Sequence, residues 1–207
     1  MRGKRLQRPR GKRPERSRYL IYCEDQNAGV DYFKGLAGEL RAQIKIGPQH
    51  GEPLSLVKAA IAHKNRAPNC REDRCTEYDE VWCVVDVEAP EPHPGLASAL
   101  QLAAVHGIRV ALANPCFELW VVLHFESVTA YHETTRMQSL LRQRGYCGYD
   151  ARRKAIEYSA LRNLYGTARA NALALRLGAV DGHLSNPWTD IDELVEHIRV
   201  DSAKGQR

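Results

Sequence analysis

Short apolar runs alternate with longer stretches of helical periodicity along most of this sequence. The apolar runs at 19–23, 43–46, 80–85 and 108–113 are rich in β-branched and aromatic residues, which is typical of strands. Helical spacing of apolar residues follows each run, at 28–41, at 54–65, at 95–106 and from Asn114-Pro115 through 125. Strands that alternate with helices predict an α/β fold with a mostly parallel sheet covered by helices.

The pattern changes near residue 130, after which only helices are expected, at 134–144, 151–177 and 189–200. Asn114 and Pro115 are expected to open the preceding helix, because Asn caps well and Pro suits the first helical turn. We therefore divide the chain into a tail at 1–18, an α/β core at 19–130 and a helical C-terminal extension of the same domain at 131–207.

Positive charge is concentrated in residues 1–18, which contain nine Arg or Lys and one Glu. This segment carries +8, which leaves −3 for the remainder, since the formal net charge is +5. So polar a segment cannot bury itself and is expected to be disordered alone. It could bind phosphates through counterion release, or it could serve only as a solubilising leader.

The composition indicates a soluble, cytoplasmic protein. Apolar residues make up 43% of the chain, which is enough for a core. The longest apolar run, near 118–125, is too short to span a membrane, and no apolar signal-peptide core follows the first charges. The six cysteines lack the spacing of a zinc site, so they are interpreted as structural or incidental.

Acidic residues follow two of the expected strands. Glu24 follows the run at 19–23, and Asp86 and Glu88 follow the run at 80–85. Open α/β sheets bind ligands beyond the carboxyl ends of their strands. Because converging carboxylates repel one another, a cation between them is favoured, and Mg²⁺ or Mn²⁺ suits oxygen ligands. The alternative is that acids are common where strands reach the surface; Asp25 could simply cap the next helix.

Several motifs resemble those of the RloB-like family, across about residues 18–200. The most specific is ALANPCFELWVVLHF at 111–125. The others are LIYCEDQNAGVDYFKGL at 20–36, YDEVWCVVDVE at 78–88, Lys154, ARANA at 168–172 and NPWTDIDELVEHI at 186–198.

RloB-like proteins are in turn similar to Toprim domains, which are Rossmann-like and carry a glutamate after the first strand and two acids after a later one. The resemblance implies magnesium-dependent phosphodiester cleavage. Glu24 would act as general acid or base, and Asp86 and Glu88 would hold the metal, which Glu24 could also contact. It further implies an effector of anti-phage or abortive-infection systems, with an AAA-type or ABC-type ATPase as partner. Related Toprim effectors cut nucleic acid, tRNA among the targets.

The sequence departs from the family pattern at three places. Asp25 stands where a small Gly is usual, Glu88 replaces an aspartate, and the neutral stretch QNAG at 26–29 replaces an acid. These changes concern activity rather than fold.

Further candidate residues lie outside the three acids. Glu118, within the FELW motif, is a candidate catalytic or substrate-contacting acid; the alternative is that it pairs with a neighbouring Arg or Lys. Asn114 and the basic run Arg152, Arg153 and Lys154 are candidate substrate contacts, although charged helix starts are ordinarily only solvated.

Two functional classes remain beside a nuclease acting on RNA or DNA. A catalytically degenerate regulatory or binding subunit of the ATPase would keep the fold without cleavage. A plain nucleic-acid-binding module would depend on residues 1–18.

Overall fold

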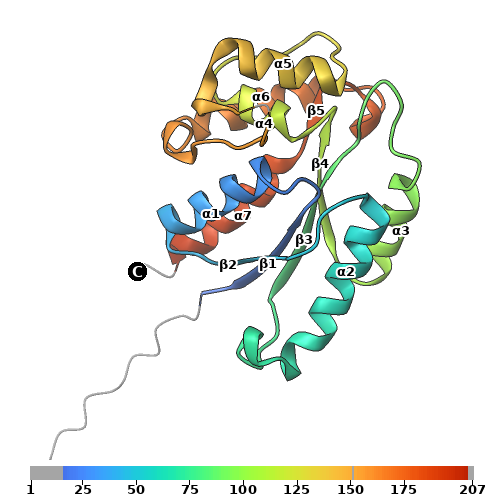
Figure 1. The fold of residues 1–207 in the computed structure, drawn as a ribbon, viewed down its shortest axis with the longest axis vertical. Helices are drawn as coiled ribbons and strands as arrows, with labels where there is room; N and C mark the ends of the chain where they lie inside the picture. Colours follow the sequence, from blue (N-terminus) through green and yellow to red (C-terminus); the bar gives the residue numbers. More distant parts are fainter. Residues whose placement is uncertain (1–15, 151, 205–207) are drawn as a thin grey trace, which may run out of the picture.

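The computed structural model describes residues 16–150 and 152–204, and the greater part of the basic tail, residues 1–15, lies outside them. Five strands form one sheet in the order β2-β1-β3-β4-β5 (Figure 1). Neighbouring strands among β1 to β4 are parallel, and β5 pairs antiparallel with β4, which confirms the α/β class. The strands are β1 (Arg18–Cys23), β2 (Gln43–Ile46), β3 (Glu80–Asp86), β4 (Arg109–Asn114) and β5 (Trp188–Thr189).

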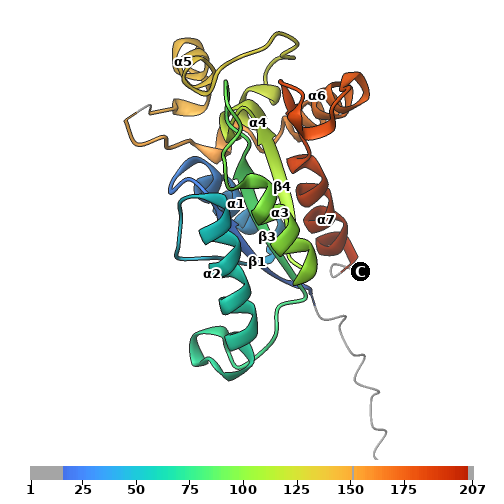
Figure 2. The same ribbon diagram turned by 90° about the vertical axis from the view of Figure 1, so that its right-hand side faces the viewer.

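Helices cover both faces of the sheet (Figures 1 and 2). Helices α1 and α7 pack on one face, α2 and α3 pack on the other, and α4, α5 and α6 gather beyond the carboxyl ends of the strands. The helices are α1 (Ala28–Leu40), α2 (Pro53–Arg66), α3 (Leu96–Val105), α4 (Phe117–Leu123), α5 (Thr134–Arg144), α6 (Tyr165–Gly178) and α7 (Ile191–Lys204). Five 3₁₀ turns join them, at Ala67–Asn69, Arg71–Asp73, Tyr146–Gly148, Tyr158–Ala160 and Gly182–Leu184.

Strand β1 shows why these apolar runs form buried strands. Successive side chains point to opposite faces of a strand, and both faces of this sheet are covered. Tyr19, Ile21 and Cys23 enter the core under α1 and α7, whereas Leu20 and Tyr22 enter the core under α2 and α3. A strand buried on both faces therefore has a nearly continuous apolar run rather than an alternating one.

The sequence predicted most elements within one or two residues, and it predicted the helix that leads to residue 125, but the start of that helix at Asn114-Pro115 was wrong. Asn114 is the last residue of β4 and pairs with Trp188, and its bond to Pro115 is cis. Helix α4 begins at Phe117, and its N-cap residue Cys116 has extended backbone angles and no side-chain capping bond. The Asn-Pro pair therefore ends a strand rather than starting a helix.

The C-terminal part differs from the expectation of helices alone. Of the helix expected at 151–177, only α6 forms; residues 152–157 turn back, and Asp150 bridges to Ala155. The helix expected from 189 begins at Ile191, because Trp188 and Thr189 form the unexpected strand β5.

The strand order places a topological switch between β1 and β3. The chain leaves β1 through α1 on one face to reach β2 and returns through α2 on the other face to reach β3. Crossovers that diverge to opposite faces leave a crevice outside the carboxyl ends of the two strands, where open α/β sheets bind ligands. Glu24 and Asp86 stand at these two strand ends.

Two expectations about the chain as a whole can be compared with the described residues. Among their helices, none combines the length and the apolar character that crossing a bilayer requires. The six cysteines are free thiols, and Cys23, Cys83, Cys116 and Cys147 are buried.

Candidate active site at the carboxyl edge of the sheet

The carboxylates expected after β1 and β3 meet at the switch point. The backbone N–H of Glu24 continues the ladder by donating to the carbonyl of Val84 at 3.1 Å. Its side chain turns toward β3, where Oε2 accepts a hydrogen bond from the backbone N–H of Asp86 at 3.0 Å. The two strand ends are thus joined through an acidic side chain.

Asp86 is held from the opposite side by α4. Its Oδ1 accepts the backbone N–H of Phe117, the first residue of that helix, at 2.9 Å. This N–H has no partner within the helix, and the positive end of the peptide dipoles favours a carboxylate there. Asp86 is therefore fixed between β3 and α4.

The surroundings of both acids favour their neutral forms. Burial, followed by repulsion from Glu88, Asp25 and Glu52, raises the pKa of Glu24 to about 7, although the N–H of Asp86 acts in the opposite direction. Burial also raises the pKa of Asp86 well above its usual range, with further contributions from Glu24, Glu118 and Asp25. Such shifts mark a cluster whose charge is not compensated by the protein.

Asp25 caps the start of α1, which agrees with the interpretation of this acid as a helix cap. Its carboxylate accepts the backbone N–H groups of Asn27 at 2.6 Å and Gly29 at 3.0 Å. A Cβ at Gly29 would lie 3.1 Å from Oδ2 of Asp25 and 3.3 Å from Sγ of Cys23, so glycine permits this close approach. The QNAG stretch therefore builds the turn that carries the chain from Glu24 into α1.

Glu118 is buried, with 3% of its surface exposed, and it pairs with no Arg or Lys of residues 16–150 and 152–204. Its Oε1 accepts a hydrogen bond from the hydroxyl of Tyr149 at 2.8 Å. Tyr149 is itself buried, and burial together with the charge of Glu118 raises the pKa of its hydroxyl. Glu118 also lies close enough to Asp86 for its charge to raise the pKa of that acid.

Glu88 lies at the rim rather than within the cluster. Its side chain is exposed, and its backbone has a φ of 70°, which is uncommon for a residue other than glycine. Its N–H donates to the carbonyl of Pro115 at 2.9 Å, which ties the loop after β3 to the start of α4. Glu88 is nevertheless close enough to Glu24 to raise the pKa of that acid.

The basic run expected to contact substrate forms an exposed turn. Lys154 approaches the acids, since its charge lowers the pKa of Asp25, and it adopts a φ of 50°. Arg153 instead pairs with Asp150, with 3.2 Å between Nε and Oδ2. Arg152 is exposed, and its backbone N–H bonds to the same Asp150 side chain at 2.9 Å. Lys154 is therefore the residue of the three that the structure brings to the acids.

Asn114 is directed away from solvent, contrary to what a ready substrate contact requires. It is 3% exposed, and its Nδ2 donates to the carbonyl of His183 at 3.0 Å. Its Oδ1 is buried without a hydrogen-bond partner in the described part of the chain. Asn114 therefore fixes the turn before β5 to the end of β4.

The acidic cluster partly fits the expected Mg²⁺ or Mn²⁺. Within residues 16–150 and 152–204, no three His, Cys, Asp or Glu side chains are grouped so as to hold a metal ion, so the set Glu24, Asp86 and Glu88 is not assembled. Magnesium, however, commonly uses one or two carboxylates together with waters and substrate phosphates. Glu24 and Asp86 provide two carboxylates, each engaged through one oxygen, and are the residues that would hold such an ion.

Sequence reasoning did not assign Tyr149 a place in this site. Its aromatic neighbour Tyr146 instead packs within the protein, where its ring stacks on Phe125 with 4.1 Å between the ring centroids. The hydrogen bond between Tyr149 and Glu118 joins residues 31 positions apart, and a contact over this distance cannot be predicted from a local sequence motif.

The comparisons with known proteins agree with the motifs. The model of a family described as "RloB-like protein" matches residues 19–198, nearly the whole described chain, which confirms the resemblance. No curated protein and no solved structure gave a significant match.

Proposed function

We propose that this chain, which belongs to the RloB-like protein family, is a metal-dependent nuclease that cuts phosphodiester bonds in RNA or DNA. The observation that carries the proposal is that the Glu24 carboxylate reaches the end of β3 at the switch point of the sheet, where it accepts the backbone N–H of Asp86 and its charge acts on the Asp86 carboxyl group. A phosphodiester placed there would lie at the edge where such sheets bind ligands. The similarity to Toprim domains adds the expected order of acids, one after the first strand and two after a later one.

Each nearby residue has a role that follows from its position. Glu24 and Asp86 would hold the metal, with Glu88 approaching from the rim, and Glu24 would take or give a proton at the reacting oxygen. A bound magnesium ion would supply charge stabilisation for the phosphoryl group and an activated water. Lys154 would contact the phosphate from the rim, and Glu118, held by Tyr149, would keep its carboxylate facing Asp86.

We further propose that the protein is the effector of an anti-phage or abortive-infection system and works with an AAA-type or ABC-type ATPase. This part rests on the family resemblance alone. An ATPase gene beside this one, and co-purification of the two products, would support it.

The nuclease proposal is tested with the full chain, alone and with its ATPase. Labelled RNA and DNA are incubated with Mg²⁺, Mn²⁺ or a chelator. Glu24→Gln and Asp86→Asn should each reduce cleavage by about 100-fold or more. Glu91→Gln, which changes an exposed acid in the same loop, should retain activity and serves as the matched control. Equal cleavage by parent, Glu24→Gln and Asp86→Asn would contradict the assignment.

A degenerate regulatory subunit is the second candidate, favoured by the absence of an assembled three-ligand set among the described residues. The exposed side chain of Glu88 and the replacement of a usual glycine by Asp25 point the same way. This function predicts a stable complex with the ATPase and no cleavage under any metal condition. Metal-dependent cleavage that Asp86→Asn abolishes would exclude it.

A further inference from the structure

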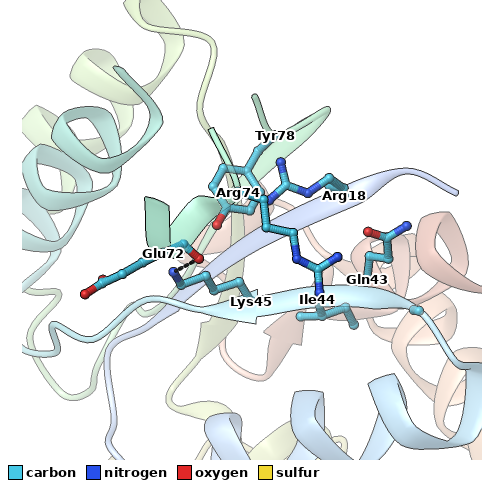
Figure 3. Close-up of a pocket in the computed structure, with 8 residues that line it drawn as sticks. Arg18, Gln43, Ile44, Lys45, Glu72, Arg74 and Tyr78 are labelled. Atoms are coloured by element: carbon cyan, nitrogen blue, oxygen red, sulfur yellow. Dashed lines mark hydrogen bonds between the residues drawn. The ribbon is translucent and has the colours of Figure 1, made fainter. Parts of the chain in front are cut away.

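A hollow of about 430 Å³ lies beside the edge strand β2, at the opposite end of β1 from Glu24 (Figure 3). Its walls come from the start of β1, from β2 and from the loop before β3. Three cationic side chains, Arg18, Lys45 and Arg74, line it together with Tyr78, Gln43 and one acid, Glu72. The acidic cluster uses none of these residues.

The guanidinium of Arg18 is held by backbone carbonyls, and it forms no ion pair with an acid in the part of the chain that the structure describes. It donates to the backbone carbonyls of Thr76 at 2.9 Å, Glu77 at 2.8 Å and Asp73 at 2.9 Å. It also lies over the ring of Tyr78, with its Cζ 4.6 Å from the centroid. Backbone carbonyl groups orient a guanidinium but, being uncharged, do not neutralise it. Arg18 therefore presents a fixed positive charge to the hollow.

Lys45 is different, because its charge is matched by a buried acid. Its Nζ lies 2.8 Å from Oδ1 of Asp73, which is 1% exposed and also bonds to His63 and Tyr78. The positive character of the hollow therefore depends on the two arginines.

Arg74 contributes the second guanidinium of the hollow. It adopts a φ of 58°, its side chain is exposed, and it makes no ion pair or side-chain hydrogen bond with any residue in 16–150 or 152–204. Figure 3 shows its guanidinium extending across the hollow toward β2, whereas the carboxylate of Glu72 points away from both arginines. Two guanidinium groups thus face the hollow, and Glu72, the acid in its lining, turns its carboxylate away from them (Figure 3).

We propose that this hollow binds a phosphate group of the nucleic-acid strand on which the proposed nuclease acts. A guanidinium matches phosphate in both charge and hydrogen-bond geometry. The hollow is far larger than one phosphate, and an adjoining hollow of about 460 Å³ shares Arg18, Gln43 and Arg74 with it, so a longer ligand can continue along the surface. Two acids, Glu77 and Asp79, line that second hollow, whereas Glu72 is the acid in the lining of the first and its carboxylate points away (Figure 3), so the phosphate is assigned to the first.

The position of the hollow suits a polymer that also reaches the acids. The six residues of β1 separate Arg18 from Glu24, a span on the order of 20 Å. A single phosphate cannot contact both ends of this strand, but a polynucleotide can. Only the identity of the ligand as the substrate strand rests on the proposed nuclease function.

The test measures binding of single-stranded RNA and DNA to the full chain in a chelator, where cleavage cannot occur. Residues 1–15 carry seven Arg or Lys and contribute background binding, so the control must match the charge change. Arg74→Ala is compared with Arg71→Ala, which removes the same charge from the same loop but outside the hollow. Thermal unfolding confirms that both variants fold.

Arg74→Ala should weaken strand binding by about tenfold and reduce the slope of log affinity against log salt by about 0.7, while Arg71→Ala does neither. Equal effects of the two variants would overturn the proposal. So would binding of a nucleoside triphosphate that depends on Arg74 while strand binding does not. Selective loss with Arg74→Ala in a protein that never cleaves would retain the site and reject the nuclease.

Discussion

Oε2 of Glu24 accepts a hydrogen bond from the backbone N–H of Asp86, with 3.0 Å between the two atoms. Through this bond the residue after β1 holds the last residue of β3, which in turn accepts the N–H of Phe117 from α4. Three elements are therefore joined by acids whose ionised forms repel one another. Removing such a charge should improve stability while it harms function.

Glu24→Gln separates these two effects. The amide oxygen of Gln can still accept the N–H of Asp86, whereas the repulsive charge is lost. We expect the metal-free variant to be as stable as the parent at neutral pH or more stable by about 1 kcal/mol, with cleavage reduced by about 100-fold. Chemical denaturation and a cleavage assay measure the two. A large loss of stability would contradict the repulsion argument, because the variant can keep the hydrogen bond to Asp86.

The stability of the metal-free protein should fall as pH rises. Burial and neighbouring acids raise the pKa of Glu24 from 4.5 to about 7. An acid with a higher pKa in the folded state contributes stability that is complete below about 4.5 and is lost as pH rises through about 7. Asp190, whose pKa burial also raises to about 7, contributes in the same direction. The Glu24 part is isolated by comparing parent with Glu24→Gln in denaturation curves across this range, and identical pH slopes would count against it.

Tyr149→Phe should weaken the site without removing any of its acids. The change deletes the hydroxyl that donates to Oε1 of the buried Glu118 at 2.8 Å. We expect a loss of 1–3 kcal/mol, typical of an unpaired buried polar group, and weaker Mn²⁺ binding. Tyr146→Phe is the control, because that ring stacks on Phe125 and its hydroxyl makes no hydrogen bond in the described ranges. A stability loss with unchanged Mn²⁺ affinity would limit Tyr149 to packing.

Asp73→Asn should destabilise the loop before β3. Burial favours the neutral form of Asp73, but hydrogen bonds from Lys45, Tyr78 and His63 outweigh it and hold its pKa well below the usual range. Breaking one side of a buried ion pair costs about 3 kcal/mol. Thermal and chemical unfolding measure this, with Glu72→Gln as the exposed neighbour that should change little. Similar small changes in both variants would mean that the network contributes little.

The alternation of strands and helices predicted the first four strands, because strands buried on both faces have long apolar runs that periodicity detects. Strand β5 was not predicted, because its two residues are too few to show the alternation of apolar and polar side chains. The helix expected at 151–177 was too long because the Asp150 side chain closes a turn onto the N–H groups of Arg152 and Arg153. These side-chain hydrogen bonds compete with the backbone hydrogen bonds of a helix. Which of the two conformations forms depends on tertiary packing, which the sequence does not show.

The residues of the candidate site likewise fall into those that the sequence predicted and those that it did not. Glu24 and Asp86 could be predicted to meet, because both follow strands and parallel strands end at one edge of a sheet. The exposure of Glu88 could not, since it depends on a backbone with positive φ in the loop after β3. The burial of Asn114 likewise follows from its pairing with β5, which the sequence did not indicate.

Binding of Mn²⁺ to the full chain, measured by isothermal titration calorimetry at neutral pH, tests the central claim most directly. If Glu24 and Asp86 share a divalent ion, the parent should bind Mn²⁺ at one site, Asp86→Asn should lose that binding, and Glu91→Gln should retain it. No Mn²⁺ binding by the parent, with or without a nucleic-acid strand present, or equal binding by Asp86→Asn, would contradict the account.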